Sequence, residues 1–289
     1  MKKEIITLTA AVISLITALV GAIGTVKSNL PWAIAFTILV IMLLILSAIL
    51  YFWCLNRKTE VDNYSFFHKI MHELRNYRFE LLKVYSDRDK EGRTSLLAEK
   101  YLKTGVKNAI GELCNLLNNN KVGKKNISVC VKLLKKNSQN ELCVTTLCRK
   151  TENNNRRNLD VSLYALTGNT GLNDVYQKQC SEWSCADLNK LYGYVNFNQN
   201  WREQYTSTLI IPIRIQRTYL HKIESFHIEN GCRDGNYVFL GFLCADSIDA
   251  GAFGLDGENN IFRSAMSATA DALFSYIDHC QHLIAKYKK

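Results

Sequence analysis

Aromatic side chains gather in the segment between residues 183 and 202, which ends at the cation Arg202. Aromatic walls with a single cation can frame a planar anionic ligand such as a nucleotide. The same aromatic residues can instead fill a second hydrophobic core, and the sequence leaves both interpretations open. The candidate ligand-binding residues are Trp183, Tyr192, Tyr194, Phe197, Trp201 and Arg202.

The ten cysteines and six histidines do not form a recognisable metal site. Zinc sites often pair two cysteines across a gap of two residues, and no such pair is present. The nearest alternative is the group of His279, Cys280 and His282 on a predicted helix. Free, buried thiols are much commoner than such a site, so neither a metal ion nor a cofactor is expected.

Sequence motifs for catalysis are also missing. The chain has no Gly-rich phosphate loop, no His-Glu-x-x-His zinc motif and no Gly-x-Ser-x-Gly nucleophile motif. His68 and His72 are close enough to share a helix face, but the rest of a metalloprotease motif is absent. We therefore expect a protein without enzymatic activity.

The formal net charge is +10, and basic residues are concentrated between Asn119 and Asn158. Such a cluster can face anionic lipid, where each close charge contributes roughly 1 kcal/mol. It can equally meet an acidic nucleotide or RNA, or it can simply keep the domain soluble. Specific binding of nucleic acid is not expected, because aromatic residues do not alternate with these charges. The basic residues are Lys121, Lys124, Lys125, Lys132, Lys135, Lys136, Arg149, Lys150, Arg156 and Arg157.

Two long uncharged segments precede all of these sites. Ile5–Val26 and Asn29–Asn56 contain no charged residue, and each is longer than the roughly 20 apolar residues that cross a bilayer. We predict a hairpin of two transmembrane helices over residues 5–26 and 31–55, within a first domain at 1–58. A cleaved signal peptide is the alternative, but its apolar core usually has only about 7–15 residues.

The distribution of lysine and arginine predicts the orientation of this hairpin. Lys2 and Lys3 precede the first span, Arg57 and Lys58 follow the second, and only Lys27 lies in the connecting loop. Because cytoplasmic flanks carry the excess of positive charge, both termini are expected in the cytoplasm and the protein in the cell membrane. Cysteines of a cytoplasmic domain are expected to stay reduced.

Residues 59–93 are predicted to form an amphipathic helix and a linker. Apolar residues between Tyr64 and Tyr85 recur at steps of three and four. This helix can pair with a second copy in a homo-oligomer or pack against its own domain.

In the last part of the chain, residues 94–289, the sequence predicts helices on both sides of a run of strands. This order indicates an α+β domain in which helices flank an antiparallel sheet. Alternating or continuous apolar runs indicate the strands. Predicted strands cover residues 127–133, 142–147, 208–215 and 237–244, and predicted helices cover 96–117, 172–178, 185–192 and 261–283.

Two of these strands resemble those of GAF domains. Tyr205–Ile213 (YTSTLIIPI) resembles the family's strand that begins with a small residue and ends at Val/Ile-Pro-Ile/Leu. Tyr237–Asp246 (YVFLGFLCAD) resembles its partner, in which Gly241 precedes a hydrophobic run that ends at Asp246. Phe253 and the helix that follows it resemble the C-terminal end of a GAF domain. A PAS-like domain is the alternative fold.

The resemblance implies a module that binds a small molecule or a protein, that is often dimeric, and that couples a pocket to flanking helices. In such folds the pocket lies on one face of the sheet under an irregular segment, which here carries the candidate residues from Trp183 to Arg202. The signature of cyclic-nucleotide-binding members is absent, as is a chromophore or haem attachment.

The expected function is that of a membrane-anchored, non-enzymatic sensor whose GAF-like domain binds a small anionic ligand, such as a nucleotide, or a protein partner. No output domain is expected beyond Lys289, so the hairpin or a separate protein would provide the output. One alternative is a bacterial antiviral-defence effector that permeabilises the membrane on binding a nucleotide signal. Another is a structural membrane anchor for a partner protein.

Overall fold

The computed structural model describes residues 30–86, 91–119, 126–150, 162–220, 224, 226–229, 235–253 and 260–287. The chain divides into two compact units, residues 1–62 and 63–289.

Helix α2, Leu30–Ser86, contains the second predicted span and the predicted amphipathic helix. The first predicted span, residues 5–26, lies outside the described residues. In the part of the chain that the structure describes, no helix has both the length and the apolar character needed to cross a membrane.

Seven strands within the described residues form one antiparallel sheet, with β3-β2-β1-β7-β5-β4 as its order and β6 paired to β7. The three central strands, β1, β7 and β5, are almost continuously buried because both faces of the sheet are covered. The bounds are β1 Ile127–Lys136, β2 Leu142–Lys150, β3 Tyr164–Ala165, β4 Trp183–Cys185, β5 Ser207–Gln216, β6 Ile228–Glu229 and β7 Tyr237–Ser247.

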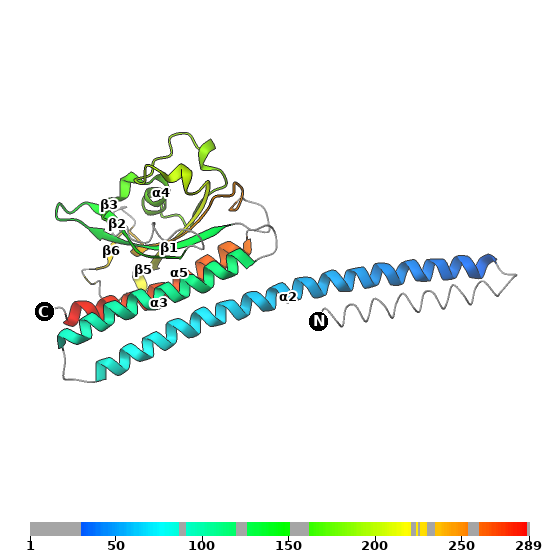
Figure 1. Cartoon of the computed structure of the whole chain (residues 1–289), viewed down its shortest axis with the longest axis horizontal. Helices are drawn as coiled ribbons and strands as arrows, with labels where there is room; N and C mark the ends of the chain where they lie inside the picture. The colour runs from blue at the N-terminus through cyan, green and yellow to red at the C-terminus, as the bar shows by residue number, and fades with distance from the viewer. Residues whose placement is uncertain are drawn as a thin grey trace. The chain divides into compact units, whose positions relative to one another are not determined.

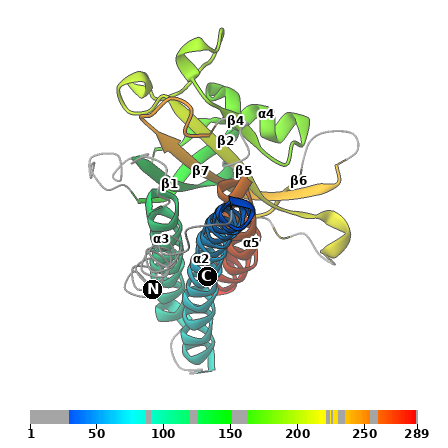
Figure 2. The same ribbon diagram turned by 90° about the vertical axis from the view of Figure 1, so that its right-hand side faces the viewer.

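One face of the sheet packs on helices α3, Glu91–Asn119, and α5, Asn260–Tyr287. These two helices lie side by side in both views (Figures 1 and 2). Gly105 in α3 permits their close approach, because a Cβ there would lie only 2.3 Å from the hydroxyl of Tyr276 in α5. Residues 63–86 of α2 add Ile70 and Leu74 to the same core.

The opposite face is covered by α4, Thr170–Lys178, and by an irregular segment that follows it (Figure 2). The predicted helix over 185–192 is wrong. Its first residue belongs to β4, which pairs with β5, and Leu188–Lys190 forms a single 3-10 turn that the Asp187 side chain caps. Long-range strand pairing and a local cap thus override the weak helical pattern.

The predicted fold class is confirmed at the level of an α+β domain with an antiparallel sheet between helices, an arrangement that fits the GAF-like expectation.

Candidate ligand-binding site

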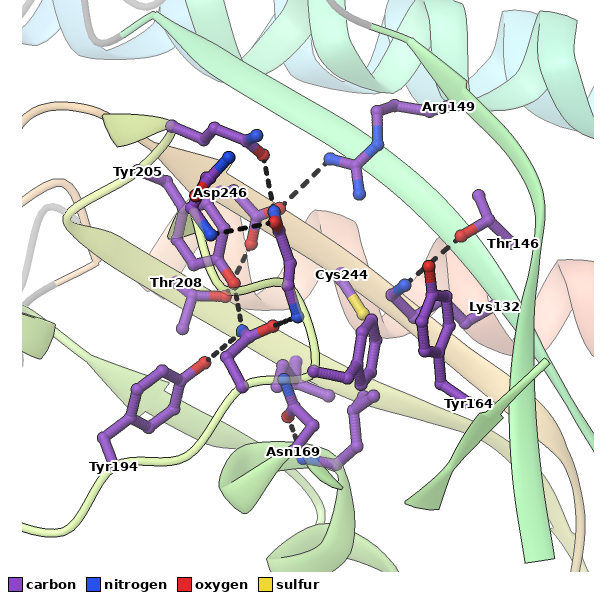
Figure 3. Close-up of a pocket in the computed structure, with 17 residues that line it drawn as sticks. Lys132, Thr146, Arg149, Tyr164, Asn169, Tyr194, Tyr205, Thr208, Cys244 and Asp246 are labelled. Carbon is purple, nitrogen blue, oxygen red and sulfur yellow. Dashed lines mark hydrogen bonds and ion pairs between the residues drawn. The ribbon is translucent and has the colours of Figure 1, made fainter. Parts of the chain in front are cut away.

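A cavity of about 420 Å³ lies between the sheet and the irregular segment that covers its second face (Figure 3). Its floor consists of side chains from β1, β2, β5 and β7, and its roof consists of residues between Tyr194 and Tyr205. Cavities of about 300–1,000 Å³ are typical of small-molecule sites. The size and position of this cavity therefore suit a small ligand.

A β-bulge determines which side chains of β2 face the cavity. Cys130 and Lys132 of β1 pair with Arg149 and Thr146 of β2, and the register shifts between these two pairs. Alternate residues of a strand face one side, so Thr146 and Arg149 would point to opposite faces in a regular strand. The extra residue in the bulge allows both to line the cavity.

Arg149 and Asp246 form a buried ion pair in the floor. Nη1 of Arg149 donates to Oδ2 of Asp246 at 3.2 Å and to the hydroxyl of Ser128 at 3.2 Å. The hydroxyl of Thr208 donates to Oδ1 of Asp246 at 2.8 Å. These contacts hold the guanidinium and the carboxylate in fixed positions next to the cavity.

Arg149 retains hydrogen-bonding capacity in this position. Its Nε is buried and has no hydrogen-bond partner among the described residues. Burial opposes the positive charge, but the neighbouring Cys130 and Asp246 outweigh it and raise the pKa of Arg149. A charged guanidinium with an unused buried donor is costly unless something accepts from it.

Lys132 supplies a second cation to the floor. Its Nζ lies 3.3 Å from the hydroxyl oxygen of Thr146 and 4.8 Å from the ring centroid of Phe197. Among the ion pairs between described residues, none includes Lys132. The described lining therefore carries two cations, Lys132 and Arg149, against one carboxylate, Asp246, and favours an anionic group.

The roof is held together by side-chain amides rather than by regular secondary structure. The Asn196 amide donates to the Tyr205 hydroxyl and, at 3.0 Å, to the Tyr194 hydroxyl. The backbone N–H of Asn198 donates to the side-chain Oδ1 of Asn196 at 2.9 Å, and the Asn198 side-chain amide donates to Oε1 of Gln204 at 2.8 Å. Burial raises the pKa of Tyr194, so its hydroxyl stays protonated and available for hydrogen bonds.

Two of the six candidate residues line the cavity, namely Tyr194 and Phe197. The ring of Phe197 stacks on Tyr164, with centroids 4.4 Å apart and an interplanar angle of 10°. Tyr164 itself also lines the cavity. The stacked pair thus forms an aromatic wall at the edge of the polar floor.

The other four candidate residues lie elsewhere. Trp201 is 4% exposed and packs with Leu188 and Tyr205 in a small separate cluster, against which Trp183 also packs. Arg202 covers the Trp201 ring at 4.7 Å, and Tyr192 is fully exposed. Trp183 and Trp201 therefore pack in a hydrophobic core, which is the second of the two interpretations given for the aromatic segment.

The polar residues of the floor were missed by reasoning from the sequence. The sequence places Lys132 and Arg149 in a basic cluster, although a lysine at an alternate position of an apolar strand is a signal for one polar face. Asp246 was noted only as the end of a hydrophobic run. The alternating asparagines at 196, 198 and 200 indicate a hydrogen-bonded loop, but they do not reveal what lies under it.

No protein-family model and no curated protein matches this chain. Several solved structures are similar to this chain. One is a GAF sensor protein from Burkholderia vietnamiensis, with 12% sequence identity and a TM-score of 0.41. The match covers 77% of this chain and 98% of that protein. The GAF domain of a phosphoenolpyruvate-protein phosphotransferase from Coxiella burnetii has 13% identity, coverages of 75% and 96%, and a TM-score of 0.42.

A far-red cyanobacteriochrome photoreceptor has 11% identity over 71% of this chain and 99% of its own, with a TM-score of 0.44. At these identities and TM-scores the likeness says nothing of ligands, and the cavity has to be understood from its own residues.

Proposed function

We propose that residues 94–289 form a non-enzymatic sensor domain that binds a small anionic molecule in the cavity between the sheet and its roof. The observation that carries this proposal is the charge of the described lining, with two cations, Lys132 and Arg149, against one carboxylate, Asp246. The amides of the roof and the Tyr164–Phe197 wall would bind the polar and planar parts of the same ligand.

The central strands offer a route from the cavity to the helices. In β1, Lys132 faces the cavity while Val131 and Leu133 pack in the core shared with the helices α3 and α5. In β7, Asp246 faces the cavity while Ala245 packs in that core. A ligand that draws Lys132 or Asp246 toward itself would therefore shift residues that contact the helical layer.

We further propose that the first unit anchors this domain to a lipid bilayer, with both termini in the cytoplasm. The uncharged runs of the sequence support the anchor, as do the large apolar side chains from Ile41 to Trp53, which are 45% to 65% exposed. A continuous exposed apolar stretch is typical of surfaces that contact a membrane or another protein.

Native mass spectrometry of the full chain, released from detergent micelles, tests the ligand proposal. We expect a retained anionic small molecule in the wild type and its loss in the Lys132→Gln variant. Lys135→Gln is the matched control, because Lys135 is in the same strand but is exposed. Equal retention by both variants would place the molecule elsewhere.

If the purified chain is empty, thermal unfolding with a panel of nucleotides and metabolite carboxylates follows. A binding ligand is expected to raise the melting temperature of the wild type, and to do so much less in Lys132→Gln. No stabilisation by any member of the panel would count against a small anionic ligand.

A further inference from the structure

Cys130 and Cys244 occupy facing positions on β1 and β7. Both side chains belong to the core on the cavity side of the sheet, and both are buried, free thiols. Facing Cα atoms of antiparallel strands are about 4.5 or 5.5 Å apart, depending on the type of pair. Disulfides span Cα separations of about 4.4–6.8 Å, so the backbone already permits a bond between these two residues.

The charges around this pair favour a thiolate. A hydrogen bond from the Cys244 thiol lowers the pKa of Cys130; burial opposes this effect, while Arg149 and Lys132 add to it. The pKa of Cys244 is raised in turn, because it keeps the proton that the two sulfurs share. By contrast, burial raises the pKa of Cys148, on the neighbouring strand, to about 12.

The pair also has access to small molecules, because Cys244 lines the cavity. The other cysteine of the pair lies directly beside it and is fully buried. A small oxidant in the cavity can therefore meet the pair, whereas larger reagents cannot reach Cys130. Reactive cysteines are typically found in electropositive surroundings that reagents can reach, and here the cavity provides the access to Cys244.

We propose that Cys130 and Cys244 are a redox site, which hydrogen peroxide or a small organic hydroperoxide converts into a disulfide across the cavity floor. Cys244, the sulfur that lines the cavity, passes the shared proton to Cys130 and attacks one peroxide oxygen as the thiolate. The O–O bond breaks, and hydroxide or alkoxide leaves, which gives a sulfenic acid on Cys244. The remaining thiol gives its proton to that leaving group and attacks the sulfenic sulfur. The S–S bond forms as the S–O bond breaks, and hydroxide leaves.

The oxidation would change the cavity as well as the two cysteines. It removes a negative charge that contributes to the high pKa of Arg149, and it crosslinks the two central strands. Reduction by a dithiol would restore the pair. The proposal does not depend on the cavity having a ligand.

Peptide mapping of the full chain in detergent tests this proposal. The protein is treated with hydrogen peroxide, quenched in acid, unfolded, alkylated and digested without reductant. We expect one dominant linked peptide pair, joining the peptides of Cys130 and Cys244, and its disappearance after treatment with dithiothreitol.

Three variants support the assignment. Cys130→Ser and Cys244→Ser should each abolish the linked peptide, whereas Cys148→Ser, on the next strand but on the helical side of the sheet, should leave its yield unchanged. Full alkylation of both Cys130 and Cys244 after peroxide would overturn the proposal, as would crosslinks distributed over other cysteines. The decisive measurement uses the wild-type chain, so it does not rely on the variants folding.

Discussion

Arg149 and Asp246 share a buried ion pair, with side chains that are only 6% and 9% exposed. Replacing both residues by apolar ones can be neutral in such a place, but removing one partner leaves an uncompensated buried charge. The same pair positions the cavity floor, because Asp246 is also held by Thr208. At the scale of single residues, the site and the stability of the domain thus depend on the same contacts.

We expect Asp246→Asn to lower the free energy of unfolding by about 3–5 kcal/mol, because it leaves the Arg149 charge buried without its carboxylate. Denaturant unfolding of the variant and of the wild type measures this loss. Asp174→Asn is the matched control, since Asp174 pairs with Lys178 in an ion pair whose side chains are 25% and 65% exposed. That change should cost less than about 1 kcal/mol, and equal losses in the two variants would contradict the assignment.

The limit of sequence reasoning is clearest at these residues. The sequence points to Arg202 as the cation of the aromatic segment, whereas it places Arg149 in a basic cluster between residues 119 and 158. The bulge in β2 places Arg149 in the cavity floor, because it reverses the face of the sheet on which the Arg149 side chain would otherwise lie. A bulge depends on pairing between strands, so one strand's sequence does not reveal it.

The four main strands could be predicted from the sequence because each is a long apolar or alternating run. Their predicted ranges fall within β1, β2, β5 and β7. The short strands β3, β4 and β6 were missed, since two or three residues carry no periodicity and their pairing is long-range. The conformation of the roof could not be predicted from the sequence either, because side-chain hydrogen bonds such as that from Asn198 to Gln204 hold its shape.

Gly241 shows how one residue can determine the packing of an element. It lies in the centre of β7, opposite Leu133 of β1, and a Cβ there would come within 2.0 Å of the backbone oxygen of Lys132. Only glycine allows β1 and β7 to pair closely at this point. The glycine noted in the GAF-like strand therefore has a physical role in the register of the central strands.

We expect Gly241→Ala to destabilise the domain by at least about 1–3 kcal/mol, because β1 would have to move away from β7. Gly111→Ala is the control: it lies in α3, and its added Cβ would meet nothing within 4 Å. That change should stabilise the helix by about 0.5–1 kcal/mol. Thermal or denaturant unfolding measures both, and a Gly241→Ala variant as stable as wild type would disprove the close approach.

The two units of the molecule differ in how much apolar surface they expose to water. Residues 63–289 enclose a continuous core shared by the sheet and helices α3 and α5. In the other unit, the described side chains from Ile41 to Trp53 are largely exposed and apolar. Each Å² of apolar surface left in water costs roughly 25 cal/mol, so a stretch of this kind is expected to find a lipid or protein environment.

We therefore expect the full chain to remain with the membrane fraction after washing in alkaline carbonate and to be released by detergent. Residues 63–289 expressed alone should stay in the aqueous fraction, because that unit has its own core. Immunoblots of the two fractions measure the distribution. Recovery of the full chain in the carbonate supernatant would contradict membrane anchoring, and the exposed apolar stretch would then be better explained by contact with another protein chain.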